Sequence, residues 1–104
     1  MKEHSEIREM ISHTVHEVDP KAKVILFGSR ARGDSRTDSD WDVLIVIDSP
    51  KVTMNMFKSL GYELWVKGLE AGQEINPIIY TKSQWDNARP SLFRHHILEE
   101  GVVL

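Results

Sequence analysis

The first half of the chain follows two hydrophobic periods, one helical and one extended. In residues 3–18, apolar side chains recur at helical spacing with charged residues between them, which predicts an amphipathic helix that ends before Pro20. Residues 23–27 form a short apolar run typical of a buried strand. Polar, turn-rich residues 33–40 follow. Residues 42–47 are strongly β-prone, and beyond Asp42 both the odd and the even positions are apolar. This half therefore predicts a helix, a strand, a turn into a helix, a polar turn region and a central strand.

The second half has weaker but similar periodicity. Residues 52–69 place apolar side chains at helical spacing and predict a second long helix. Residues 74–80 are expected to form a third strand, and Pro77 indicates that this strand lies at a sheet edge because proline cannot donate a ladder hydrogen bond. Residues 83–87 and 91–100 predict two further helical segments.

The resulting order, α-β-α-β-α-β-α, predicts an α/β (α+β) fold. We expect a small mixed β-sheet of about three strands with helices mainly on one face. A chain of 104 residues can bury one modest core, so residues 1–104 are expected to form a single domain. Trp41 and Trp65 are most simply core or helix-packing residues.

Composition and charge narrow the functional classes. Lys and Arg number 13 against 16 Asp and Glu, and the net charge of −3 disfavours a broad clamp on nucleic acid, which needs clustered positive charge. No apolar run approaches membrane-spanning length, and no signal-peptide pattern is present. The chain has no cysteine, which fits a reducing compartment. We therefore expect a cytoplasmic protein with no membrane association.

The residues that follow the first predicted strand are suited to binding an anion. Gly28 would let a ligand approach the backbone closely because no Cβ intervenes. Ser29 is expected to open a helix, whose first amides and hydroxyl would bind the phosphates of a nucleoside triphosphate. Arg30 and Arg32 are near enough to add positive charge. The simpler interpretation is a serine-capped turn with two solvated arginines.

Two acidic residues at the start of the second strand are suited to binding a metal. Asp40 and Asp42 are two positions apart, so both carboxylates would leave the same face of a strand, with Trp41 on the other face. Paired carboxylates repel each other, and a bound divalent cation is the usual reason for such a pair. Mg²⁺ takes oxygen ligands and retains substrate phosphates, so the pair indicates phosphoryl or nucleotidyl transfer. Alternatively, the two residues satisfy backbone amides in a loop.

Together these motifs resemble a known family. Residues 28–33 with residues 39–42 are similar to the Gly-Ser and Asp-x-Asp signature of the minimal nucleotidyltransferases, in the DNA polymerase beta-like superfamily. Residues 97–104 also resemble the ending of that family.

The resemblance implies an enzyme that transfers a nucleoside monophosphate, with ATP as the expected donor, to a hydroxyl of a protein or small molecule. It implies that Gly28 and Ser29 hold the triphosphate and that Asp40 and Asp42 ligate Mg²⁺. Family members are often paired with a small helical HEPN-type protein as antitoxin to its toxin, so such a partner is expected here. Whether the chain forms a homo-oligomer stays open.

This chain departs from the family pattern at the position of the third carboxylate. Its expected place on the third strand falls on Asn76, which is neutral and cannot act as a base. Glu74 lies two positions earlier, about 7 Å away at Cα along a strand, and is the alternative acid. The candidate catalytic residues are thus Asp40, Asp42, Glu74 and Asn76.

Two other functions compete with an active transferase. The first is an antitoxin-like binding module of the same fold, with impaired catalysis and residual or no nucleotide binding because of Asn76. The second is an α/β interaction domain that binds no ligand. Position 76 and calorimetry with ATP and Mg²⁺ discriminate among the three.

Overall fold

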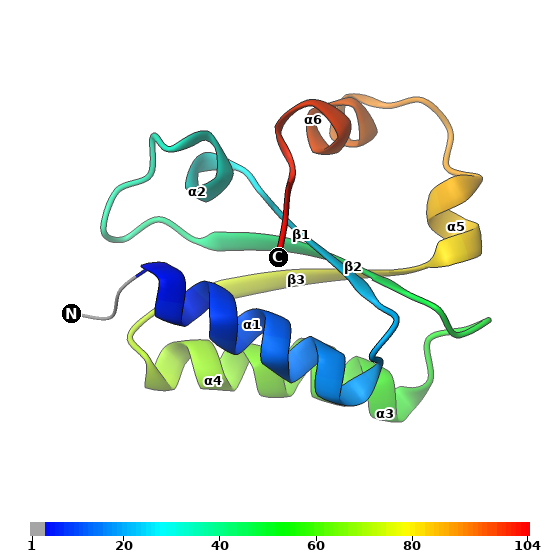
Figure 1. Cartoon of the computed structure of the whole chain (residues 1–104), viewed down its shortest axis with the longest axis horizontal. Helices are drawn as coiled ribbons and strands as arrows, with labels where there is room; N and C mark the ends of the chain where they lie inside the picture. The colour runs from blue at the N-terminus through cyan, green and yellow to red at the C-terminus, as the bar shows by residue number, and fades with distance from the viewer. Residues whose placement is uncertain (1–3) are drawn as a thin grey trace.

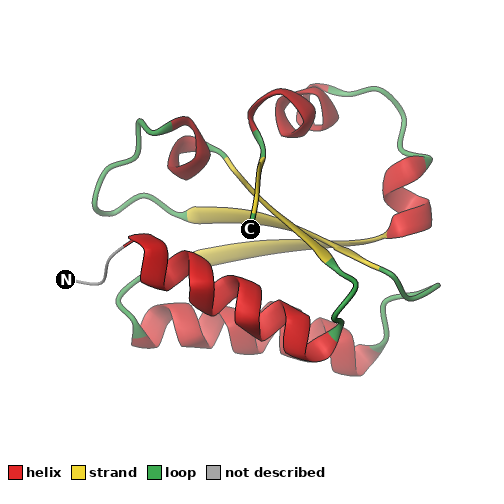
Figure 2. Ribbon diagram, in the orientation of Figure 1, coloured by secondary structure: helices red, strands yellow, loops and turns green. Residues whose placement is uncertain are grey.

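A four-stranded mixed β-sheet forms the centre of the molecule (Figures 1 and 2). The computed structural model describes residues 4–104. The strands run in the spatial order β3-β2-β1-β4, with bounds β1 Lys23–Phe27, β2 Trp41–Ile47, β3 Ile75–Thr81 and β4 Val102–Val103. The helices are α1 His4–Val18, α2 Ser29–Arg32, α3 Met54–Phe57, the π-helical η1 Lys58–Glu63, α4 Leu64–Glu70, α5 Lys82–Asp86 and α6 Leu92–Glu100.

This architecture confirms the predicted α/β fold with a small mixed sheet, and it adds a strand. β4 pairs antiparallel with β1 and was not predicted, so the sheet has four strands among the described residues rather than about three. β3 lies at the sheet edge, as Pro77 predicted. The start of the first predicted helix at residue 3, and the first three residues of the predicted domain 1–104, lie outside the described residues.

Strand register brings the sequence motifs together. β1 and β2 are antiparallel, and Phe27 pairs with Asp42. β2 and β3 are parallel, and Asp42 pairs with Asn76. The end of β1, the beginning of β2 and the beginning of β3 therefore meet at the same end of the strands. The chain leaves β1 there through Gly28.

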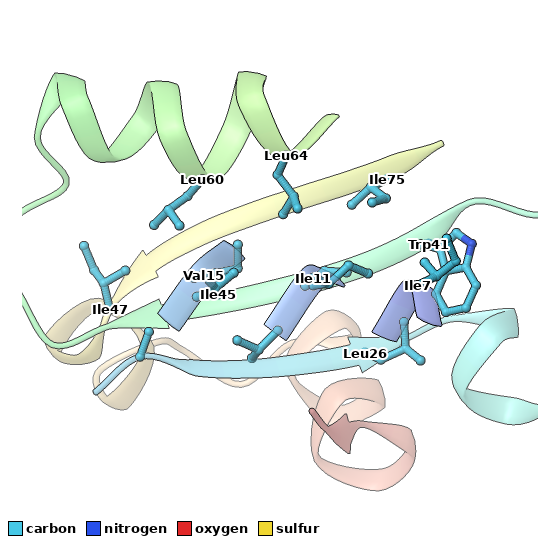
Figure 3. Close-up of a cluster of buried hydrophobic side chains, with 13 residues drawn as sticks. Ile7, Ile11, Val15, Leu26, Trp41, Ile45, Ile47, Leu60, Leu64 and Ile75 are labelled. Carbon is cyan, nitrogen blue, oxygen red and sulfur yellow. The ribbon is translucent and has the colours of Figure 1, made fainter. Parts of the chain in front are cut away.

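The main core lies between the sheet and one layer of helices. α1 and the continuous helical segment α3-η1-α4 lie side by side against this face (Figure 1). Their buried side chains meet alternate residues of the strands, as the close-up in Figure 3 shows: Ile7, Ile11, Val15, Leu60 and Leu64 against Leu26, Trp41, Ile45, Ile47 and Ile75. Each fully buried Leu or Ile contributes about 1.5–3 kcal/mol relative to an exposed one.

A smaller cluster covers the opposite face of the sheet. Ile25, Leu44 and Val46 pack there against Ile97 of α6. Aromatic rings surround this cluster, with Phe27 and Phe93 in an edge-to-face arrangement at 5.5 Å between centroids. Because residues alternate along β2, Asp42 lies on this second face together with Leu44, whereas Trp41 lies in the main core.

Trp41 and Trp65 were expected to be core or helix-packing residues, and only Trp41 lies in the core. Trp41 is 1% exposed, but Trp65 is 38% exposed and lies outside the core. Within residues 4–104, no helix is both long enough and apolar enough to cross a membrane.

Candidate functional site

Gly28 makes the bend between β1 and α2 in a conformation that favours glycine. Its φ is 76° and its ψ is −158°. A Cβ at this position would lie 2.5 Å from Oδ2 of Asp42, so a larger residue would displace that carboxylate. The sequence predicted that a ligand approaches the backbone here, and in this structure the group close to Gly28 is the Asp42 carboxylate.

Ser29 opens α2 as its first helical residue. Gly28 occupies the N-cap position and provides no side-chain cap hydrogen bond, so the serine-capped turn is not the structure adopted here. The amides of Ala31 and Arg32 bond to the Gly28 carbonyl at 3.1 and 3.0 Å and are thus used within the helix. A phosphate at this bend would therefore meet the beginning of α2, next to the Ser29 hydroxyl.

Three polar side chains converge beside this bend from β2 and β3. Asp40 precedes β2, Asp42 lies within it, and the Asn76 amide donates a hydrogen bond to Oδ2 of Asp40 at 3.0 Å. Asp40 is exposed and Asp42 is half-buried. The cluster is thus open to solvent on one side and rests against the sheet on the other.

The electrostatics of the cluster disfavour the charge on Asp42. Burial raises the pKa of Asp42, and the negative charge of Asp40 raises it further. A hydrogen bond from Asn76 and the positive charge of Arg32 lower the pKa of Asp42 and only partly offset these effects. A cation placed between the two aspartates would remove the unfavourable interaction.

The two aspartates fit a magnesium ion that is held mainly by its other ligands. Among the described residues there is no group of three or more His, Cys, Asp or Glu side chains that could enclose a metal. Two carboxylates are nevertheless the usual protein contribution to Mg²⁺, which keeps several waters and binds substrate phosphates. The all-oxygen donor set of Asp40 and Asp42 is therefore compatible with Mg²⁺ bound together with a nucleotide.

Glu74 does not occupy the strand position that sequence analysis assigned to it. β3 begins at Ile75, and Glu74 lies exposed just before it. The Glu74 carbonyl accepts a hydrogen bond from the Trp41 amide at 2.8 Å, which joins the beginnings of the two strands. Asn76, and not Glu74, is the residue that contacts the aspartates in this structure.

Arg30 is buried and is used to hold the loop of residues 33–40. The side chain is only 5% exposed, and its guanidinium lies over the Trp41 ring at 4.6 Å from the centroid. It donates to the Ser39 carbonyl at 2.9 Å and to the Thr37 carbonyl at 3.3 Å. It also donates to the Gln73 side chain, which accepts a second bond from the Trp41 indole. These contacts argue against the phosphate contact expected for Arg30, and they fix the loop that ends at Asp40.

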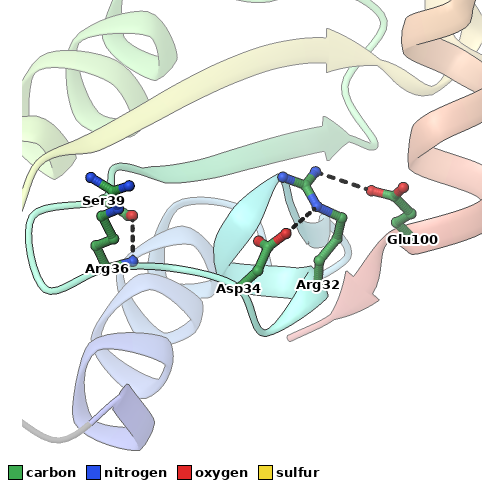
Figure 4. A network of polar contacts seen from close by, with 5 residues as sticks. All are labelled: Arg32, Asp34, Arg36, Ser39 and Glu100. Carbon is green, nitrogen blue, oxygen red and sulfur yellow. Dashed lines mark hydrogen bonds and ion pairs between the residues drawn. The ribbon is translucent and has the colours of Figure 1, made fainter.

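Arg32 is exposed and lies near the aspartates. It donates hydrogen bonds to Asp34 at 3.2 Å and to Glu100 of α6 at 3.3 Å, as Figure 4 shows. The pKa of Arg32 is raised by these two acidic partners. Because its charge also lowers the pKa of Asp42, Arg32 is the arginine of the motif that remains a candidate phosphate contact.

Two residues that organise the site, Gln73 and Glu100, were not predicted from the sequence. Gln73 joins Arg30 to Trp41, and Glu100 brings α6 to Arg32. Both lie far along the chain from their partners, and no local pattern marks a glutamine or glutamate for such a contact.

Comparison with known proteins agrees with the geometry. The family model of the nucleotidyltransferase domain matches residues 6–103. A protein of Methanocaldococcus jannaschii, named "Putative protein adenylyltransferase", is 39% identical over 82 residues, which are 79% of this chain and 76% of that protein.

Two solved structures share the fold. A "putative nucleotidyltransferase from Sulfolobus solfataricus" aligns with a TM-score of 0.60 and 20% identity, covering 94% of this chain and 76% of that one. A toxin-antitoxin crystallised with AMP-PNP aligns with a TM-score of 0.59 and 16% identity, covering 91% of this chain and 70% of that one. Since the family model covers nearly the whole chain, and the glycine bend and paired aspartates lie together within it, the chain belongs to the nucleotidyltransferase domain family.

Proposed function

We propose that this protein transfers a nucleoside monophosphate, with ATP as donor, to a hydroxyl group of a protein in a Mg²⁺-dependent reaction. The observation that carries the proposal is the placement of the Asp42 carboxylate directly above the Gly28 bend, with Asp40 beside it. In this proposal the two carboxylates would bind a metal ion next to the strand end and helix beginning that would bind phosphate.

Each residue has a defined part in this proposal. Asp40 and Asp42 would hold Mg²⁺, which when bound neutralises charge on the triphosphate and orients it. Gly28 and Ser29 would bind the phosphates, and Arg32 would add positive charge beside them. The acceptor oxygen would form a bond to the α-phosphorus, and the bond from that phosphorus to the oxygen bridging the β-phosphate would break. Pyrophosphate would leave, and the hydroxyl proton would pass to water because Asn76 cannot accept it.

The named relatives support ATP as donor and protein as acceptor class. The Methanocaldococcus protein carries the name of a protein adenylyltransferase, and the toxin-antitoxin structure contains AMP-PNP, an ATP analogue. We infer from them that the acceptor of this chain is a toxin-like partner, for which a small helical HEPN-type protein is the candidate. A small-molecule acceptor is the alternative that the labelling experiment below distinguishes.

A second candidate function follows from Asn76. A site with two carboxylates and a neutral amide could bind a nucleotide and one metal ion without activating an acceptor hydroxyl. The protein would then act as an antitoxin by binding its partner, and nucleotide would modulate or merely accompany that binding.

Labelling with ATP that carries a radioactive α-phosphate tests the first function. We expect label on the HEPN-type partner protein in the presence of Mg²⁺, and a decrease of at least about 100-fold in Asp40→Asn and in Asp42→Asn because each removes a metal ligand. Asp86→Asn, an exposed acid on α5, is the matched control and should transfer label normally.

Three results would change the conclusion. Label on a small molecule alone would exclude the protein acceptor. ATP and Mg²⁺ binding by calorimetry without transfer, together with transfer gained in Asn76→Asp, would establish the binding module instead. Undiminished transfer in both aspartate variants would remove Asp40 and Asp42 from the mechanism.

A further inference from the structure

The helical segment α3-η1-α4 exposes an apolar stripe on the side that does not enter the core. We define the outer stripe by its five large apolar side chains, with exposed fractions of 83%, 60%, 60%, 38% and 47%: Met54, Phe57, Tyr62, Trp65 and Leu69. Leu60 and Leu64, which point into the main core from the same segment, are fully buried. The segment is thus apolar on two sides, although only the side with Leu60 and Leu64 packs into the core of the monomer.

The outer stripe is larger than packing within the monomer explains. A surface helix typically presents polar residues on the side away from the core. Here two aromatic rings, Tyr62 and Trp65, lie 6.0 Å apart between centroids on the exposed side. Contiguous exposed aromatic and aliphatic side chains are characteristic of surfaces that contact another protein.

The spacing of the outer stripe is nearly symmetric about its middle. Met54 and Leu69 are equally distant from the midpoint between Gly61 and Tyr62, and Phe57 and Trp65 are almost so. A two-fold rotation about that midpoint, with the two helices antiparallel, would therefore place Met54 on Leu69 and Phe57 near Trp65 of the other copy. Such self-complementarity is what an isologous interface requires.

Gly61 provides room for close approach at the midpoint. A Cβ added at Gly61 would have no heavy atom within 4 Å, so the space beside its backbone is open. Small residues allow helix backbones to approach closely, and large side chains from the other helix can fill the gap. In the two-fold arrangement, Tyr62 of each copy would lie opposite Gly61 of the other.

The charges next to the outer stripe agree with the same arrangement. Lys58 precedes the midpoint and Glu63 follows it, both on exposed positions of η1. In the antiparallel pair, Lys58 of one copy lies within two residues of the level of Glu63 of the other, roughly 3 Å along the axis. Opposite charges thus meet twice, once on each side of the two-fold axis.

We propose that the protein forms a two-fold symmetric homodimer through the outer stripe, with the α3-η1-α4 segments packed antiparallel about Gly61. The segment packs on the sheet face opposite to that of Asp42, so both candidate sites would remain open in the dimer. The proposal does not depend on nucleotidyl transfer and concerns a different face of the molecule.

Sedimentation equilibrium of the full chain tests the dimer. We expect the mass to rise toward twice the 12.0 kDa chain mass as concentration increases. The double variant Phe57→Glu with Trp65→Glu should raise the dissociation constant at least about 100-fold, because it buries uncompensated charge. Leu98→Glu changes a 67% exposed leucine of α6 outside the outer stripe and should leave the mass unchanged. Circular dichroism would verify that each variant is folded.

Charge reversal tests the antiparallel register. Lys58→Glu and Glu63→Lys should each weaken self-association by at least about threefold, since like charges would face each other. An equimolar mixture of the two variants should form a heterodimer with restored affinity. A monomer at every soluble concentration would overturn the proposal and leave the outer stripe to a different protein. A dimer unaffected by the Phe57 and Trp65 substitutions, or a mixture no tighter than its parts, would also overturn it.

Discussion

At the scale of single residues, the candidate site requires glycine at one position and holds a disfavoured charge at another. Gly28 has a positive φ, and the Asp42 carboxylate fills the space that a side chain at Gly28 would need. Asp42 is half-buried next to a second acid. Protein segments that accept such local cost are commonly functional sites.

The raised pKa of Asp42 leads to a prediction about pH. The folded state binds the Asp42 proton more tightly than the unfolded state, so its ionisation destabilises the fold as pH rises above the unfolded value of about 3.9. Asp42→Asn keeps the shape of the side chain and removes the charge. We expect this variant to unfold at a higher urea concentration than the wild type at pH 7. The increase in the free energy of unfolding should be less than about 1 kcal/mol, because the site is partly solvated.

The gain should diminish as pH falls toward 3, where Asp42 of the wild type is protonated. Added Mg²⁺ should stabilise the wild type and not Asp42→Asn, which narrows the difference at pH 7. Asp86→Asn, which lies on α5, provides the control for general loss of negative charge. A wild type that is more stable than Asp42→Asn at pH 7 without Mg²⁺ would contradict the pKa shift.

At the scale of elements, the loop of residues 33–40 is organised by one buried side chain from α2. Arg30 reaches the carbonyls of Thr37 and Ser39 and packs over Trp41. Its planar guanidinium offers several donors in fixed directions, which the single ammonium of lysine cannot reproduce. Asp40 is the last residue of this loop, so Arg30 positions a candidate metal ligand without touching the nucleotide site itself.

Substitution of Arg30 should therefore affect both stability and metal binding. We expect Arg30→Lys to lower the free energy of unfolding by about 2–4 kcal/mol, because the loop carbonyls lose charged hydrogen-bond donors. At temperatures where the variant is folded, its affinity for Mg²⁺ in the presence of ATP should fall at least about tenfold by calorimetry, and limited proteolysis should cut residues 33–40 faster. Arg36→Ala, on the exposed part of the same loop, is the control. Unchanged Mg²⁺ affinity in folded Arg30→Lys would reduce Arg30 to a purely structural role.

The long elements were predictable from the sequence because their hydrophobic period is local information. β1, β2 and α1 were expected within a residue or two of their observed bounds. The Asp-x-Asp pattern correctly predicted that Trp41 and Asp42 lie on opposite faces, whereas Asp40 lies just before β2 and not within the strand as expected. β4 was not predictable, because a two-residue strand exists only through its pairing with β1. The burial of Arg30 also depends on Gln73 and on loop carbonyls that no sequence window contains together.

At the scale of the whole molecule, the two faces of the sheet carry unequal shares of the stability. The face covered by α1 and α3-η1-α4 buries a large cluster of aliphatic side chains, whereas α6 contributes Ile97 as its buried residue on the other face. The same α6 supplies Glu100 to Arg32. The weaker layer is thus the one next to the candidate site, which suits an element that opens to admit a substrate.

Hydrogen exchange measures this difference directly. We expect amides of β2 to exchange only through global unfolding, and amides of α6 to exchange at least about 100-fold faster through local opening, because few buried contacts hold α6 on the sheet. Ile97→Ala should accelerate exchange of α6 further. Leu64→Ala, in the main core, should instead accelerate the exchange of β2 amides, since it removes about 2–5 kcal/mol from the global free energy of unfolding. Equal protection of α6 and β2 in the wild type would mean that both layers unfold together, and the site could then open only with the whole domain.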